Sequence, residues 1–106
     1  MFARSVTIRL KPNRVAEFTQ IIETEILPLL RQQKGFQDEI TLLLPEGLQA
    51  IGISLWDHQE DADAYSRATY PQVLKALQSV TGGVPEVHTF LVANSTFHKI
   101  AACVPV

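Results

Sequence analysis

The chain has 106 residues, close to the commonest size of one folding unit, and we expect a single domain over residues 1–106. Its hydrophobic fraction of 46% is typical of a globular protein and argues against disorder. The nine basic and eleven acidic side chains leave a formal charge of −2 and form no basic stripe, so we expect no nucleic-acid partner.

Neither a membrane nor an oxidising compartment is indicated. Apolar runs such as residues 40–45 are far shorter than the roughly 20 residues that span a bilayer, so we expect no membrane partner. Cys103 is the only cysteine, which rules out an intrachain disulfide and every cysteine-rich zinc pattern. The first five residues lack the charged and apolar regions of a signal peptide, and we expect a cytoplasmic protein.

The first quarter of the chain predicts a strand followed by an irregular helix. Residues 2–11 alternate between two faces, one of them apolar except for Arg4. Asn13 is a suitable N-cap for a helix that continues to about Gln33. Pro28 lacks the N–H that a helix interior needs, so this helix should kink or split there.

A hairpin and a second helix come next. The β-rich runs 36–45 and 48–56 are separated by a Pro-Glu-Gly turn, which predicts two antiparallel strands. Asp57 with Glu60 matches a capping box, so the second helix should begin at His58. It should continue to about Val80, with a break near residues 69–71 and a stop at residues 82–83. A last strand is expected from Glu86 to about Ile100.

This order of elements is βαββαβ, which predicts an α+β, ferredoxin-like fold: a four-stranded antiparallel sheet with both helices on one face. The runs 42–44 and 90–92 are apolar on both faces, yet the two helices can cover only one. The simplest cover for the other face is the same face of a second copy, so we expect a homodimer. The alternative is a half-solvated sheet with scattered exposed apolar groups.

No catalytic motif is present, so the candidate site residues are isolated side chains. Arg4 either faces a cavity or reaches water at the open end of the sheet along its stem. Trp56 is chiefly a core anchor that could also line a pocket. Tyr65 and Tyr70 flank the helix break, where they either place hydroxyls in a pocket or simply pack.

Two further candidates lie on the expected last strand. His88 is either a proton-transfer residue or a structural histidine. Asn94 shares its face and could orient a ligand or pair with a neighbouring strand. No grouping of these side chains predicts a metal site or a bound cofactor.

The run at residues 55–65, Leu-Trp-Asp-His-Gln-Glu-Asp-Ala-Asp-Ala-Tyr, resembles the W-x-S-x-E-x-x-x-A-[HY] stretch of the antibiotic biosynthesis monooxygenase superfamily. The resemblance implies a dimeric α+β barrel with a pocket between helices and sheet in each subunit. Some members oxidise quinols or polyketide aromatics without metal or flavin, because the phenolate itself reacts with oxygen. The protein then binds, orients and stabilises the anion.

The chain departs from the superfamily's patterns at several positions. Quinol-oxidising relatives tend to have histidine at the position of Tyr65, and often glutamate where this chain has Ser54. The haem-degrading pattern has tryptophan at Tyr65, histidine at Lys75 and asparagine on the first strand, and none of these is present. Haem degradation is therefore not expected, and quinol oxidation lacks its usual acid–base partner.

Three hypotheses follow. The first is a cofactor-independent monooxygenase acting on a small aromatic or quinol-like substrate. In it, Arg4 and His88 are catalytic, and the substrate is bound by Trp56, Tyr65, Tyr70 and Asn94. The second is a dimer that binds a small molecule without turnover, and the third is a structural dimer whose own side chains fill the pocket. A helix–sheet cavity of several hundred Å³ with converging polar groups would favour the first two.

Overall fold

The structure is a computed structural model that describes residues 1–96. Its strands are β1 (Phe2–Leu10), β2 (Phe36–Leu43), β3 (Gln49–Trp56) and β4 (Thr81–Leu91). Its helical segments are α1 (Val15–Ile21), η1 (Ile22–Ile26), α2 (Leu27–Arg31), α3 (Gln59–Ala68) and α4 (Tyr70–Leu77). Cys103 and the end of the expected last strand lie outside the described residues.

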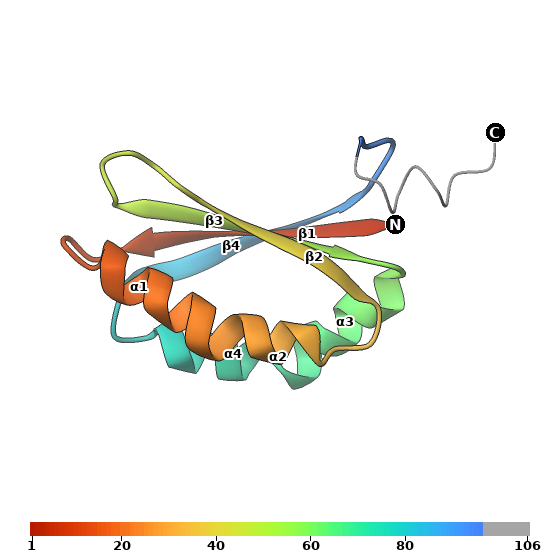
Figure 1. Cartoon of the computed structure of the whole chain (residues 1–106), viewed down its shortest axis with the longest axis horizontal. Coiled ribbons are helices and arrows are strands. Elements are labelled where there is room, and N and C mark those ends of the chain that lie inside the picture. Colours follow the sequence, from red (N-terminus) through yellow and green to blue (C-terminus); the bar gives the residue numbers. More distant parts are fainter. Residues whose placement is uncertain (97–106) are drawn as a thin grey trace.

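The strands form one antiparallel sheet in the order β2-β3-β1-β4, and the helices lie on one face of it (Figure 1). The expected ferredoxin-like α+β fold is thereby confirmed. The main core lies between these two layers and includes Phe18, Trp56, Leu77 and Val80, each almost wholly buried. None of the helices among residues 1–96 is long and apolar enough to cross a membrane.

The first helix is interrupted as predicted, and the interruption takes the form of a π-helical turn. The segment η1 separates α1 from α2, and Pro28 lies in the first turn of α2. The π-helical turn bonds the Leu27 N–H to the Ile22 carbonyl oxygen, and Pro28, which has no N–H to donate, follows directly. The predicted N-cap is wrong: Arg14 is the N-cap, and Asn13 has φ of 61°, a left-handed turn that asparagine tolerates better than most residues.

The second helix is broken at Thr69, as predicted, into α3 and α4. The predicted capping box is not formed, because His58 is the N-cap and makes no side-chain capping bond. The Asp57 carboxylate instead accepts a hydrogen bond from Gln37 Nε2 at 2.7 Å, which joins the end of β3 to the start of β2. A side-chain contact between neighbouring strands thus replaces the expected capping interaction within the helix.

The last strand begins and ends earlier than expected. Residues 82–83, predicted to stop a helix, lie inside β4, and α4 has already ended at Leu77. Beside them the β1–β4 register shifts between Thr7 and Arg9, an irregularity that two glycines accommodate easily. Because β4 ends at Leu91, Asn94 lies beyond the strand on which it was expected to share a face with His88.

The sheet face turned away from the helices is apolar over much of its area. Directly paired residues of neighbouring strands point to the same side, so the register defines this face. It includes alternate residues of β1 and their cross-strand partners. The polar partners are Asp38, Gln49, Glu86 and His88, and the apolar ones are Ile40, Leu42, Ile51, Ile53, Leu55 and Phe90. Of these, Ile40, Leu42 and Phe90 are 50%, 44% and 53% exposed. We call this surface the open face.

Candidate binding site between the helices and the sheet

A small cavity of about 60 Å³ lies between the sheet and the helices. Most of its wall is aliphatic and comes from β1, η1 and α4. The polar groups that line it are Arg4, Glu39, Ser54, Tyr65 and Tyr70. Three of these five were expected from the sequence, and they come from β1, α3 and α4.

Arg4 is buried, with only 4% of its surface exposed, so it does not reach water at the open end of the sheet. Its Nε donates a hydrogen bond to Ser66 Oγ on α3 at 3.0 Å. The guanidinium carbon lies 4.1 Å from the ring centre of Tyr70 and 5.4 Å from that of Tyr65. Within residues 1–96, no carboxylate lies within ion-pair distance of it. A buried cation without a counterion is unusual, since charges in protein interiors are normally paired.

Both tyrosines are neutral hydroxyl groups at physiological pH. Burial raises the pKa of Tyr65 to about 12, with the Arg4 charge opposing the shift. Burial also raises the pKa of Tyr70, and Arg4 again opposes it. The Tyr70 hydroxyl is buried and makes no hydrogen bond of normal geometry among residues 1–96, although Arg4 lies close to it, stacked on the ring, and opposes the rise of its pKa. The cavity therefore contains an unused donor beside an unpaired cation.

Trp56 is fully buried and supports the cavity from behind. Its ring packs against Phe36 and Tyr65, at centroid distances of 5.5 and 5.1 Å. Its Nε1 donates to Ser54 Oγ at 2.9 Å, and that hydroxyl lies 3.4 Å from the Arg4 carbonyl oxygen. Trp56 thus fixes the positions of Tyr65 and Ser54 but does not itself line the cavity.

Glu39 is the cavity residue that the sequence analysis missed. Register places it in one row across the sheet with Ser54 and Arg4, on the helix side. Its carboxylate accepts a hydrogen bond from Thr41 at 2.7 Å and lies over Gly52, where a side chain would touch it at 3.4 Å. Burial raises the pKa of Glu39, and the Thr41 bond partly offsets this. The alternation of residues 39–42 is the signal that could have found it, but alternation alone does not say which face is buried.

His88 and Asn94 lie away from this cavity. His88 pairs with Ser5, so it projects from the open face, on the opposite side of the sheet from Arg4. The centre of its ring lies 6.4 Å from that of the Phe90 ring. Asn94 is exposed beyond the end of β4. The structure therefore brings together Arg4, Tyr65 and Tyr70, with Trp56 behind them, and separates them from the other two candidates.

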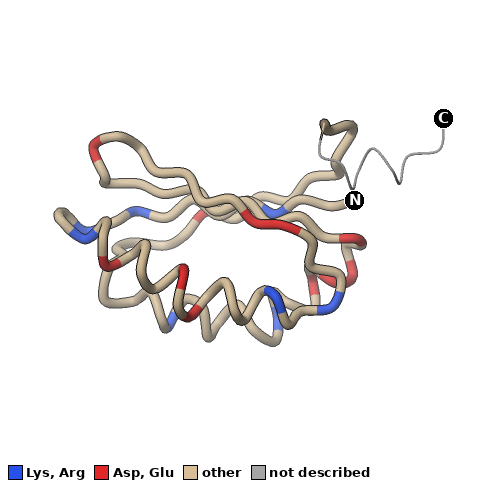
Figure 2. The backbone as a smooth tube through the Cα atoms, in the orientation of Figure 1, with Lys and Arg blue, Asp and Glu red and all other residues tan. Residues whose placement is uncertain are grey.

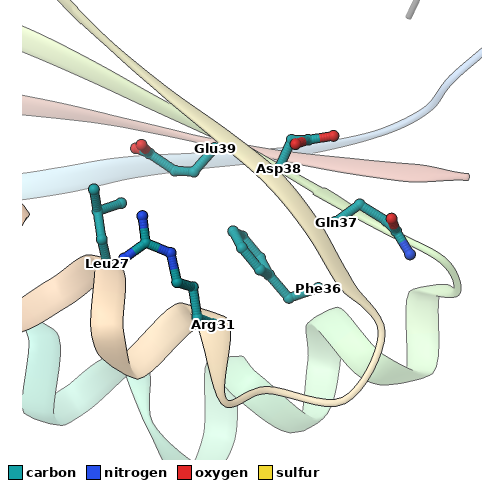
Figure 3. Close-up of a pocket in the computed structure, with 6 residues that line it drawn as sticks. All are labelled: Leu27, Arg31, Phe36, Gln37, Asp38 and Glu39. Atoms are coloured by element: carbon teal, nitrogen blue, oxygen red, sulfur yellow. The ribbon is translucent and has the colours of Figure 1, made fainter. Parts of the chain in front are cut away.

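A larger cleft of about 370 Å³ lies outside the cavity, between α2 and β2. Figure 3 shows Leu27 and Arg31 rising from α2 towards the strand, with the Phe36 ring beside them. Glu39 lines both the cleft and the cavity, so it marks the boundary between the two spaces. The cleft falls within the size range of small-molecule sites, whereas the cavity is well below it.

The charge distribution gives no other candidate site in the described part of the chain. Acidic and basic residues lie in short groups scattered along the backbone, without a continuous basic stripe (Figure 2). Within residues 1–96, no group of three histidine, cysteine or acidic side chains could hold a metal ion.

The fold is shared with solved structures of antibiotic biosynthesis monooxygenases, as the following comparisons show. The monooxygenase from the gene ActVA-Orf6 of Streptomyces coelicolor, solved with nanaomycin D, matches with a TM-score of 0.75 and 16% identity, over 91% of this chain and 90% of that one. A putative antibiotic biosynthesis monooxygenase from Bordetella bronchiseptica matches with a TM-score of 0.74 and 16% identity, over 88% and 97%.

A third similar structure is SnoaB, a cofactor-independent oxygenase from Streptomyces nogalater, with a TM-score of 0.72 and 14% identity over 90% and 95% of the two chains. No protein-family model and no curated protein sequence matches the chain. At these identities the comparisons establish a shared fold, and the resemblance seen in the sequence is confirmed at that level.

Proposed function

We propose that this protein is a cofactor-independent oxygenase of a small dihydroxyaromatic compound. The observation that carries the proposal is Arg4, a permanently charged group that is buried at the cavity without a carboxylate partner among residues 1–96. An aromatic oxyanion would supply the missing negative charge. The shared fold with proteins described as monooxygenases supports the same reaction class.

The proposed reaction requires the protein only to bind the substrate, to accept a proton from it and to stabilise the resulting anion. For a hydroquinone, the phenolate gives electrons to O₂, one oxygen atom enters the ring as a hydroxyl group, and the other leaves as water. The product is a hydroxyquinone, and the substrate itself supplies all the electrons, so atoms and electrons balance without an external reductant. Arg4 would stabilise the oxyanion, with the Tyr70 hydroxyl as a second donor.

Glu39 is the proposed acceptor of the substrate's proton. Quinol-oxidising members of the superfamily that the sequence resembles often have glutamate at the position of Ser54, and Glu39 is the direct cross-strand neighbour of Ser54. A carboxyl whose pKa is raised by burial is a better base than an ordinary one, because its protonated form is stabilised. Strands lie about 4.8 Å apart, so β1 and β2 place the backbones of Arg4 and Glu39 about 10 Å apart. An aromatic ring above Ser54 and Gly52 would span that spacing once the side chains that fill it have moved aside.

A second candidate, a binding or structural dimer without turnover, is favoured by the size of the cavity. At about 60 Å³ it is smaller than an aromatic ring requires, so an aromatic substrate has to displace side chains on entering. The cleft between α2 and β2 is the proposed entrance, because it meets the cavity at Glu39. If these side chains cannot move aside, the protein is a structural dimer whose own side chains fill the cavity.

We also propose that the protein is a homodimer formed through the open face. Isolated apolar side chains are normal on a protein surface, but the open face gathers six of them on adjacent strands. The same face of a second copy is the simplest complement, since a two-fold axis pairs a surface with itself. His88 then lies at the subunit interface and not at the cavity.

Oxygen consumption with a panel of hydroquinones tests the activity. Arg4→Lys keeps the positive charge but loses the planar fork, and it should lower turnover by about 10²-fold or more. Arg9→Lys, on the exposed side of the same strand, is the matched control and should leave turnover unchanged. His88→Ala tests the catalytic role expected from the sequence, and its turnover should equal that of the parent. Absence of turnover with every hydroquinone, or full activity of Arg4→Lys, would refute the assignment.

A further inference from the structure

The Arg4 guanidinium has donors that no group in the described chain uses. Arginine carries five N–H donors, of which only the Nε group is bonded within residues 1–96, to Ser66. The faces of Tyr65 and Tyr70 compensate part of the charge, and Arg4 lies close enough to the Tyr70 hydroxyl to oppose the rise of its pKa. The Nη atoms are not among the fully buried atoms of residues 1–96 that lack a partner, so water or a bound ligand supplies their acceptors whenever no aromatic ligand is present.

The size of the cavity limits what that acceptor can be. Its volume of about 60 Å³ corresponds to roughly two water molecules at ~30 Å³ each. An aromatic ring or an organic acid is too large without rearrangement of the walls, whereas water and monatomic anions fit. The other polar residues of the wall are Glu39, Ser54 and Tyr65, and the remainder is aliphatic, so Arg4 is the only cation among the described residues that line the cavity.

An anion satisfies this site better than water does. Water can accept the guanidinium hydrogen bonds but leaves the buried charge uncompensated, whereas an anion does both. The carboxyl group in the wall of the same cavity is Glu39, which accepts a hydrogen bond from Thr41 and is not within ion-pair distance of Arg4. The Tyr70 hydroxyl, buried and without a partner among residues 1–96, is a second donor to the same occupant.

We propose that, in the absence of an aromatic ligand, the cavity binds one small monovalent inorganic anion of the size of chloride, held by the Arg4 guanidinium and the Tyr70 hydroxyl. The inference concerns the resting protein and does not depend on turnover. It holds whether the protein is an oxygenase or a binding dimer.

The test is thermal unfolding in sodium chloride against sodium gluconate at equal ionic strength, without substrate. Gluconate is too large for the cavity, so it serves as the control for general salt effects. A ligand that binds only the folded state raises Tm in a saturable way, and at tenfold excess over Kd the rise for a domain of this size is roughly 5–10 °C. Equal Tm values in the two salts would overturn the proposal.

Variants locate the effect. Tyr70→Phe preserves the ring and removes only the unpartnered hydroxyl, so it should fold and should shift the chloride midpoint to higher concentration. Arg4→Met should abolish the chloride-specific rise, whereas Arg9→Met on the exposed side of β1 should retain it. A chloride response that is unchanged in Tyr70→Phe, or retained in Arg4→Met, would place the anion elsewhere and refute the site.

A crystallographic measurement decides the case even if Arg4→Met does not fold. Crystals of the parent protein grown in sodium bromide should show an anomalous peak beside Arg4 and Tyr70. A bromide found only on the protein surface would contradict the proposal.

Discussion

The open face should be the dimer interface, and a single charge placed on it should separate the subunits. Phe90 pairs with Ala3 and lies on this face, whereas the adjacent Leu91 pairs with Phe2 and points to the helix side. Phe90→Asp and Leu91→Asp therefore add the same charge at neighbouring positions on opposite faces. The two positions differ by one residue, and in a strand a shift of one residue reverses the face.

The exposed areas set the expected magnitude. Full burial of a large apolar side chain is worth about 1.5–3 kcal/mol. Ile40, Leu42 and Phe90 are each about half exposed, so covering the remainder in both copies contributes on the order of 4–9 kcal/mol. This figure does not include the free-energy costs of association, and burial of the remaining residues of the open face adds to it. A micromolar dimer corresponds to about 8 kcal/mol after those costs, so burial of the other residues of the open face has to supply the remainder if the dimer is to form at micromolar concentration.

Phe90→Asp removes the contribution of Phe90 in both subunits. It also buries two carboxylates in an apolar interface, at a cost of several kcal/mol each. The dissociation constant should rise by at least ~10³-fold, because each 1.4 kcal/mol is a factor of ten. Sedimentation velocity at micromolar concentration should give the parent and Leu91→Asp near twice 11.8 kDa, and Phe90→Asp near 11.8 kDa. A monomeric parent, or a dimeric Phe90→Asp, would refute the proposed interface.

The remaining predictions concern the core and the site. Trp56→Phe should cost about 1–3 kcal/mol, because it leaves the buried Ser54 hydroxyl without its donor, and Trp56→Ala should cost about 3–5 kcal/mol. Urea unfolding followed by circular dichroism measures both, and a loss below ~1 kcal/mol for Trp56→Ala would contradict the packing. The raised pKa of Glu39 means that the folded state holds this proton more tightly than the unfolded state does. The parent should therefore lose stability relative to Glu39→Gln as pH rises from about 4 through the raised pKa, and a constant difference in Tm would show that burial of Glu39 has no such effect. If hydroquinone turnover is found, treatment with a metal chelator should leave it unchanged, since residues 1–96 contain no group of three metal-ligand side chains, and loss of activity would require a different mechanism.

The sequence alone determined the order of elements and the broad fold. The alternation of residues 2–11, the Pro-Glu-Gly turn and the break near Thr69 each reflect short-range rules, and each was found where it was expected. The same rules failed at Asp57 and at the last strand. A side-chain contact with Gln37 displaced the local cap, and pairing with β1 drew residues 82–83 into the sheet.

The site was only partly visible in the sequence. Arg4 stood out because a charge interrupted an apolar face, and Tyr65 and Tyr70 stood out because they flank a helix break. Glu39 could not be found this way, because alternation shows that a strand has two faces without showing which one meets the helices. Register across three strands decided that question, and it placed Glu39, Ser54 and Arg4 in one row.

The separation of Arg4 from His88 has the same physical cause. Both residues lie on strands that pair directly, yet one register position decides whether two side chains share a face or lie on opposite sides of the sheet. Local sequence fixes the period of a strand, whereas its phase relative to the core is set by long-range pairing. The elements were therefore predictable from neighbouring residues, and the membership of the cavity was decided by tertiary structure.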